Sequence, residues 1–202
     1  AYQLSNFREN LGNYGSPTFS RQFTPFTGVN FRTGLDAYDI YEYKPSSLLF
    51  YDTYTPFTNL FYNQRTNGEL QDLSGIHSRN ITPFWNVGLR FSTMRSQGAY
   101  LRQQAKQSKV ALNTRFQSES GRYQAFVSAI WNQFEHQENG GLSNVTNFKT
   151  LESGDRTRLS VKMEDASEAF KTKNVQLDHF LFLGRASKDT AYKKRDTFIV
   201  RD

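Results

Sequence analysis

Apolar and polar side chains alternate strictly between positions 85 and 92 of the chain. Trp85, Val87, Leu89 and Phe91 take the odd positions, and polar or small residues take the even ones. Successive side chains of an extended strand point to opposite faces, so this period of two gives one apolar face, whereas a helix would scatter the same residues around its axis. The segment therefore predicts a β-strand with one apolar and one polar face.

A second segment repeats the pattern. Val110, Leu112 and Phe116 share one face of residues 110–116, and Asn113 and Arg115 share the other. Further strands are expected at residues 57–64, 70–81, 122–134, 158–163 and 174–184, with a hairpin signal at Asn67-Gly68 and a short helical turn after Asp165.

Strand length and loop length both favour a membrane barrel. Residues 122–134, at about 3.3 Å per residue, would span about 43 Å, which suits a tilted barrel strand. The connections at 81–84 and 118–121 are short, whereas those at 97–107 and 136–155 are longer and polar. No window approaches the 18 consecutive apolar residues of a membrane-spanning helix. We therefore expect an all-β fold, an antiparallel transmembrane β-barrel, although a soluble meander would show a similar pattern.

The first 55 residues differ from the rest of the chain. They are aromatic, are interrupted by glycines and prolines, and show little alternation. We expect residues 1–55 to be ordered by packing on or in the barrel, and residues 56–202 to supply its strands.

Composition excludes several kinds of chemistry. The chain has no cysteine and three histidines, His77, His136 and His179, too far apart in sequence for a zinc motif. No nucleophile elbow or phosphate loop occurs. The net charge is +6, but the longest basic run, Lys193 to Arg195, is too short to indicate nucleic-acid binding. We expect no enzyme activity, no cofactor, no metal and no nucleic-acid partner.

Six short motifs follow one another in a fixed order. They are LGNYGSP at 11–17, YDIYEYKP at 38–45, YDTYTPFTNLFY at 51–62, HSRNITPFWNVG at 77–88, GRY at 121–123 and ENGG at 138–141. Over residues 10–184 this series resembles the putative-porin family of outer-membrane proteins from Bacteroidetes-type bacteria.

The resemblance implies a porin-like barrel in a Gram-negative outer membrane, acting as a passive diffusion channel or as a structural component of an envelope complex. Its implied partners are outer-membrane lipid, lipopolysaccharide and other outer-membrane proteins or lipoproteins. Members of the family are much longer, so the chain is expected to be the N-terminal part of a larger barrel, with seven or eight strands visible. Two alternatives stay open: a soluble β-sandwich that binds glycans, and an outer-membrane enzyme with unidentified carboxylates.

A barrel in lipid assigns the two faces. An arginine facing lipid at the bilayer midplane costs about 2–4 kcal/mol, so polar residues should face the lumen. The lipid-facing set is Trp85, Val87, Leu89, Phe91, Val110, Leu112, Phe116, Leu159 and Val161, and the lumen-facing set is Asn86, Arg90, Ser92, Asn113, Arg115 and Lys162. Cations in the lumen would favour anionic solutes.

Overall fold

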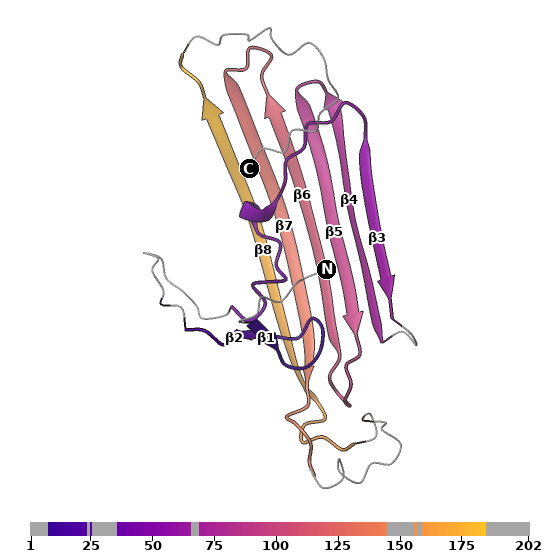
Figure 1. Ribbon diagram of the computed structural model, residues 1–202. Helices are drawn as coiled ribbons and strands as arrows, with labels where there is room; N and C mark the ends of the chain where they lie inside the picture. The colour runs from indigo at the N-terminus through magenta and orange to yellow at the C-terminus, as the bar shows by residue number, and fades with distance from the viewer. Residues whose placement is uncertain are drawn as a thin grey trace.

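A single antiparallel sheet of six strands dominates the computed structural model, which describes residues 8–23, 25, 36–65, 69–144, 156 and 159–184 (Figure 1). The strands follow one another in sequence order across the sheet. They are β3 (Phe57–Gln64), β4 (Leu70–Thr82), β5 (Trp85–Ser96), β6 (Ala105–Gln117), β7 (Tyr123–Glu138) and β8 (Ala166–Leu181).

The N-terminal part of the chain lies across one face of this sheet. A small hairpin of β1 (Arg8–Asn10) and β2 (Thr18–Ser20) sits near one end, and residues 36–56, which we call the strap, run from there toward the other end (Figure 1). The strap contains one short 3₁₀ turn, η1 (Pro45–Ser47). We call the covered side of the sheet the strap face and the opposite side the open face.

The register keeps the alternation in phase from strand to strand. Asn86 lies opposite Arg115 and Leu89 opposite Leu112, so polar residues pair with polar ones and apolar with apolar. Because side chains alternate along each strand, a matched register gives the whole sheet two chemically different faces. The connections at 83–84 and 118–122 lie at one end of the sheet. The connection at 65–69 and the two longest ones, at 97–104 and 139–165, lie at the other.

The best-packed contact between strap and sheet is aromatic. Phe134 of β7 has no exposed surface, and its ring stacks on Tyr38 of the strap with 5.0 Å between ring centres. Phe170 of β8 completes a cluster of three rings, with its centre 5.6 Å from that of Tyr38 and 6.2 Å from that of Phe134. A second apolar contact joins Tyr43 and Leu48 of the strap to Ala111 and Ile130 of the sheet.

The structure confirms an all-β, antiparallel fold and corrects two elements. The helical turn expected after Asp165 is wrong, because residues 166–173 are the first half of β8 and pair with β7. The strand expected at 158–163 is also wrong, since Val161 forms only an isolated bridge with Leu142. Residues 166–173 are mostly polar and show little alternation, but they form a strand because β7 pairs with them along their whole length. Residues 158–163 alternate without a neighbouring strand among the described residues to pair with, so they form a connection instead.

No sheet closes into a barrel among the described residues, because β3 and β8 are free edges. Two features of the sequence lie outside the described residues: the Asn67-Gly68 turn and the C-terminal stretch from Arg185 to Asp202.

We predict that Phe134→Ala lowers the free energy of unfolding by about 3–5 kcal/mol, because it opens a cavity under Tyr38. Urea unfolding followed by tryptophan fluorescence measures the change. Gln133→Ala, on the opposite side of the same strand, is the matched control. A loss of less than 1 kcal/mol in Phe134→Ala would contradict the packing described here.

Candidate functional site

Side chains of the strap face hold the strap mainly by its backbone. The Lys109 ammonium group donates a hydrogen bond to the Tyr41 carbonyl oxygen at 3.1 Å, and the Asn113 amide donates to the Leu49 carbonyl oxygen at 2.7 Å. Lys109 is 1% exposed, so its amine is enclosed between strap and sheet. A segment without regular structure must satisfy its buried backbone groups elsewhere, and the wall of the sheet does this here.

Asn132 of β7 makes the most complete of these contacts. Its Oδ1 accepts a hydrogen bond from the Tyr43 backbone N–H at 3.1 Å, and its Nδ2 donates to the Tyr43 carbonyl oxygen at 3.0 Å. The same Nδ2 lies 3.0 Å from Thr172 Oγ1, whose hydroxyl donates to Glu42. The amide thus imitates a strand partner for one residue of the strap and links it to β8.

The Tyr43 ring lies beside two cations of the strap face. The Arg90 guanidinium is 4.6 Å from the ring centre and the Lys109 ammonium is 5.2 Å from it. Both distances fall within the range of cation–π attraction, which strengthens when water is excluded. Burial of the neighbouring Tyr41 raises its pKa to about 12, so that hydroxyl is neutral at physiological pH.

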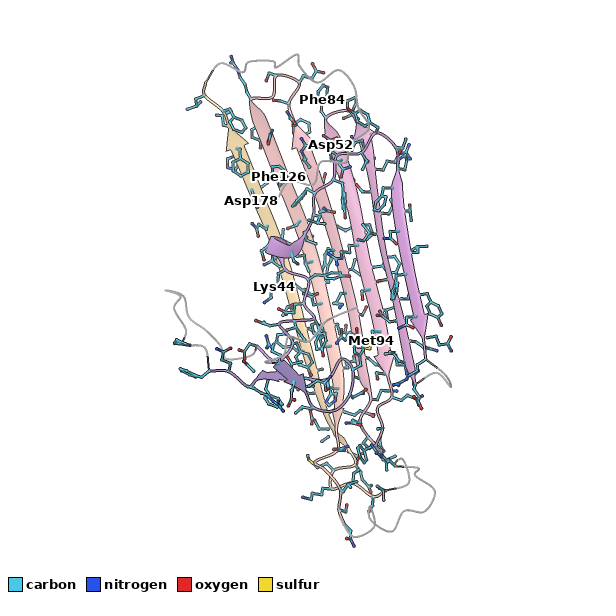
Figure 2. The ribbon with its side chains drawn as sticks, viewed as in Figure 1. Lys44, Asp52, Phe84, Met94, Phe126 and Asp178 are labelled. Carbon is cyan, nitrogen blue, oxygen red and sulfur yellow. The ribbon has the colours of Figure 1, made fainter. Side chains whose placement is uncertain are left out.

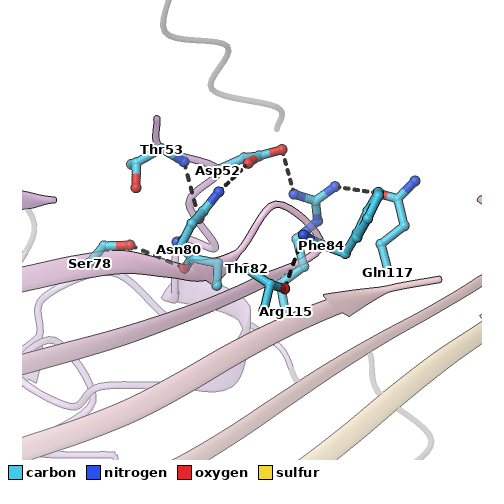
Figure 3. A network of polar contacts seen from close by, with 9 residues as sticks. Asp52, Thr53, Ser78, Asn80, Thr82, Phe84, Arg115 and Gln117 are labelled. Carbon is cyan, nitrogen blue, oxygen red and sulfur yellow. Dashed lines mark hydrogen bonds and ion pairs between the residues drawn. The ribbon is translucent and has the colours of Figure 1, made fainter. Parts of the chain in front are cut away.

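The end of the strap is fixed by a polar network around Asp52 (Figure 3). Asn80 Nδ2 donates to Asp52 Oδ1 at 3.0 Å, and the Arg115 guanidinium pairs with Asp52 Oδ2 at 2.8 Å. Burial raises the pKa of the Asp52 carboxyl, but the hydrogen bonds from Asn80 and Arg115 and the Arg115 charge outweigh it and lower the pKa. The carboxylate is therefore held in its charged form.

The hairpin loop between β1 and β2 is held at the opposite end of the sheet. Asn13 Nδ2 donates to the Gln103 carbonyl oxygen at 2.6 Å, and Gln107 Nε2 donates to the Gly15 carbonyl oxygen at 3.2 Å. Gly15 has φ +84°, and a Cβ at this position would lie 2.1 Å from the Met94 terminal methyl carbon. The positive φ favours glycine at this position, and any larger residue would also displace the end of the Met94 side chain (Figure 2).

An open cavity of about 250 Å³ lies beside Tyr43 on the strap face. Its walls come from the strap and from β3, β4 and β5, and they mix aromatic, charged and hydroxyl side chains. They include Tyr43, Asn59, Phe61, Asp72, Arg90 and Ser92.

The predicted lumen-facing residues of β5 and β6 all lie on the strap face. Asn86, Ser92 and Asn113 are buried, and Arg90 and Arg115 contact the strap. Lys162 is different, because it lies in the connection after β7 and belongs to neither face. Acidic residues share the strap face, since Asp72, Glu168 and Asp178 pair across the ladder with Met94, His136 and Phe126 of that face.

The predicted lipid-facing residues of β5 and β6 all lie on the open face, and four of them are more than a third exposed: Trp85, Leu89, Leu112 and Phe116. Val87, Phe91 and Val110 are partly buried by their neighbours. Leu159 and Val161 do not belong to this face, because the connection after β7 buries them to 5% and 6% exposure.

The apolar residues of the open face form a diagonal band. The cross-strand row through Leu60 of β3 reaches β5 at Phe91, two residues beyond Leu89. The row through Leu89 reaches β8 at Val175, two residues before Leu177. From β3 to β8 the centre of the band therefore moves four residues toward the short-turn end over five strand steps. At about 3.3 Å rise and 4.8 Å strand spacing, this drift corresponds to strands tilted by about 29°.

Titratable residues do not gather into a metal site in the described part of the chain. His136 is buried with its Nδ1 2.9 Å from Glu138 Oε1, whereas His77 and His179 lie on the open face of β4 and β8. None of the described helices is long and apolar enough to cross a membrane.

Comparison with known proteins adds the family. A family model described as Putative porin matches residues 3–200. The chain belongs to this porin family. No curated protein and no solved structure matches it. Membership of this family agrees with the all-β fold and suggests an outer-membrane location.

Lys109 and Asn132, which hold the strap, and Gln107, which holds the β1–β2 loop, were not singled out in the sequence. Lys109 and Gln107 alternate in phase with Asn113 and Arg115, so the alternation alone places them on the polar face. Their partners could not be foreseen, because these residues bind backbone groups of the N-terminal segment, which carry no side-chain signal.

We predict that Asn132→Leu speeds hydrogen exchange at the Tyr43 amide by tenfold or more, since the variant leaves two buried backbone groups unpaired at about 1–3 kcal/mol. Exchange measured by mass spectrometry on a peptide covering the strap tests this. Asn174→Leu, on the same face of β8, is the matched control. Equal exchange in both variants would show that the Asn132 clamp does not hold the strap.

Proposed function

We propose that this porin-family chain forms part of an outer-membrane β-barrel wall, with the open face toward lipid and the strap face toward the lumen. The diagonal apolar band is the observation that carries the proposal. Transmembrane barrels have strands tilted by about 35–45°, and the drift of the band across the ladder corresponds to a tilt of about 29°, just below that range.

The height of the band fits the same proposal. On β7 the outward side chains run from Tyr123 through three small or aliphatic residues to Trp131. At about 3.3 Å per residue and a tilt of about 29°, the band is about 23 Å tall, near the apolar band of about 25 Å in outer-membrane barrels. Amphipathic rings end it on both sides, as expected at the two interfaces.

The free edges require further strands in a membrane. β3 and β8 each leave a row of backbone groups unpaired, and lipid offers those groups no hydrogen-bond partner. The proposed wall is therefore completed by strands beyond β3 and β8 in the assembled barrel.

In the proposed barrel the strap would line and narrow the lumen. Its backbone is bound to side chains of β6 and β7, so the lumen in this region would be bounded by the strap rather than by the bare wall. The strap face carries acidic as well as basic side chains, so its charges give no reason to expect that anionic solutes would pass in preference to cationic ones. We propose passive diffusion of small polar solutes as the function.

We predict that the full-length protein in planar lipid bilayers gives stepwise currents. Asn132→Leu should increase the size or the fluctuation of the steps, because it loosens the strap. The current carried by single insertions measures both effects. A protein that inserts without current would be a structural component of the envelope and not a channel.

We predict that Leu89→Arg impairs membrane assembly, by about 2–4 kcal/mol if Leu89 lies near the midplane. Asn174→Arg, on the strap face, is the matched control because Asn174 is exposed there and would meet water. The fraction that folds into lipid vesicles, read from the mobility difference between heated and unheated samples, measures assembly. Equal assembly of the two variants would overturn the assignment of the faces.

A further inference from the structure

Four cations stand together on the open face at the end with the long connections. They are Arg95 of β5, Lys106 of β6, and Lys171 and Lys173 of β8. All four are exposed, and none forms a salt bridge with another described residue. We call this group the cationic belt.

The belt lies two to four residues beyond the apolar band. Arg95 is four residues beyond Phe91, and Lys106 is four residues from Val110. Val175 is the last large apolar outward residue of β8 on this side, with Lys173 two residues and Lys171 four residues from it. The belt therefore borders the band at the end with the long connections, and in a wall that faces lipid these cations would stand just outside the acyl layer.

The belt has little compensating charge from the protein. Glu135 of β7 is the one acid among the outward residues of the described strands at this level. It lies opposite Lys106 in the ladder, forms no salt bridge with it, and accepts a hydrogen bond from Gln133 at 2.8 Å, so the belt keeps a net positive charge. The remaining cation on the open face of the described strands, Arg79, lies toward the other end. Gathering like charges is unfavourable unless an anion binds among them.

We propose that the cationic belt binds the phosphate groups of lipopolysaccharide in the outer leaflet. This proposal rests on the proposed function, because it requires the open face to meet lipid. Phosphates attached directly above acyl chains would lie at the depth of the belt, and lysines near an anionic lipid surface bind it electrostatically. Long connections of outer-membrane barrels are extracellular, so the leaflet at this end is the one that contains lipopolysaccharide.

The test compares two triple variants of the full-length protein in detergent micelles. One removes belt charges, Lys106→Gln with Lys171→Gln and Lys173→Gln. The matched control, Arg79→Gln with Arg122→Gln and Lys44→Gln, removes the same charge away from the belt, since Arg79 and Arg122 lie toward the short-turn end and Lys44 lies in the strap on the other face. The probe is purified bisphosphorylated lipopolysaccharide, with dephosphorylated lipopolysaccharide and phosphatidylglycerol as comparison lipids.

We expect the belt variant to bind lipopolysaccharide about a hundredfold more weakly than the natural protein, at roughly fivefold per lysine, while the control binds within about twofold. Dephosphorylated lipopolysaccharide and phosphatidylglycerol should bind the natural protein weakly. Equal binding of the two triple variants, or equal binding of phosphorylated and dephosphorylated lipopolysaccharide, would overturn the proposal. Phosphatidylglycerol binding as strong as that of lipopolysaccharide would also overturn it.

Flotation with vesicles of phosphatidylcholine, which carries no net charge, separates this proposal from the proposed function. If the natural protein and both variants float alike but the belt variant keeps its affinity, only the belt assignment fails. If the natural protein does not float with these vesicles, the proposal that the sheet forms a wall in a membrane is wrong, and the belt proposal fails with it.

Discussion

The matched register of the six strands is the constraint on which the rest of the structure depends. Alternation in one strand gives that strand two faces, but only pairing in phase extends them over the whole sheet. A slip of one residue between β5 and β6 would place Asn113 among the apolar residues and Leu112 under the strap. The polar wall, the apolar band and the cationic belt are therefore consequences of one pairing pattern.

The strap shows how a polar wall can order a segment that has no regular structure of its own. Asn132 and Asn113 supply the hydrogen bonds that a neighbouring strand would otherwise provide, and the Tyr38 ring packs against both Phe134 and Phe170. Backbone capture of this kind depends little on the strap's side chains, whereas the aromatic contact fixes its position along the wall.

Alternation was enough to predict β5 and β6 and to divide their side chains between two faces, and the sequence also indicated strands at β3 and β4. It failed at residues 158–163, where an apparent alternation belongs to a buried connection, and at 166–173, where polar residues join β8 because β7 pairs with them. The strap's contacts could not be predicted, since a backbone carbonyl bound by Lys109 leaves no trace in the sequence. The diagonal of the band needed the register, which only the structure supplies.

The most direct test of the central claim is the depth of single residues in a bilayer. The chain has no cysteine, so a fluorophore can be attached at one introduced cysteine at a time. With quenchers placed at the bilayer centre, the account predicts equal and strong quenching at positions 60, 89 and 177, and little at 113 and 132. Strong quenching at 113 and 132, or none at 60, 89 and 177, would contradict an open face that meets lipid.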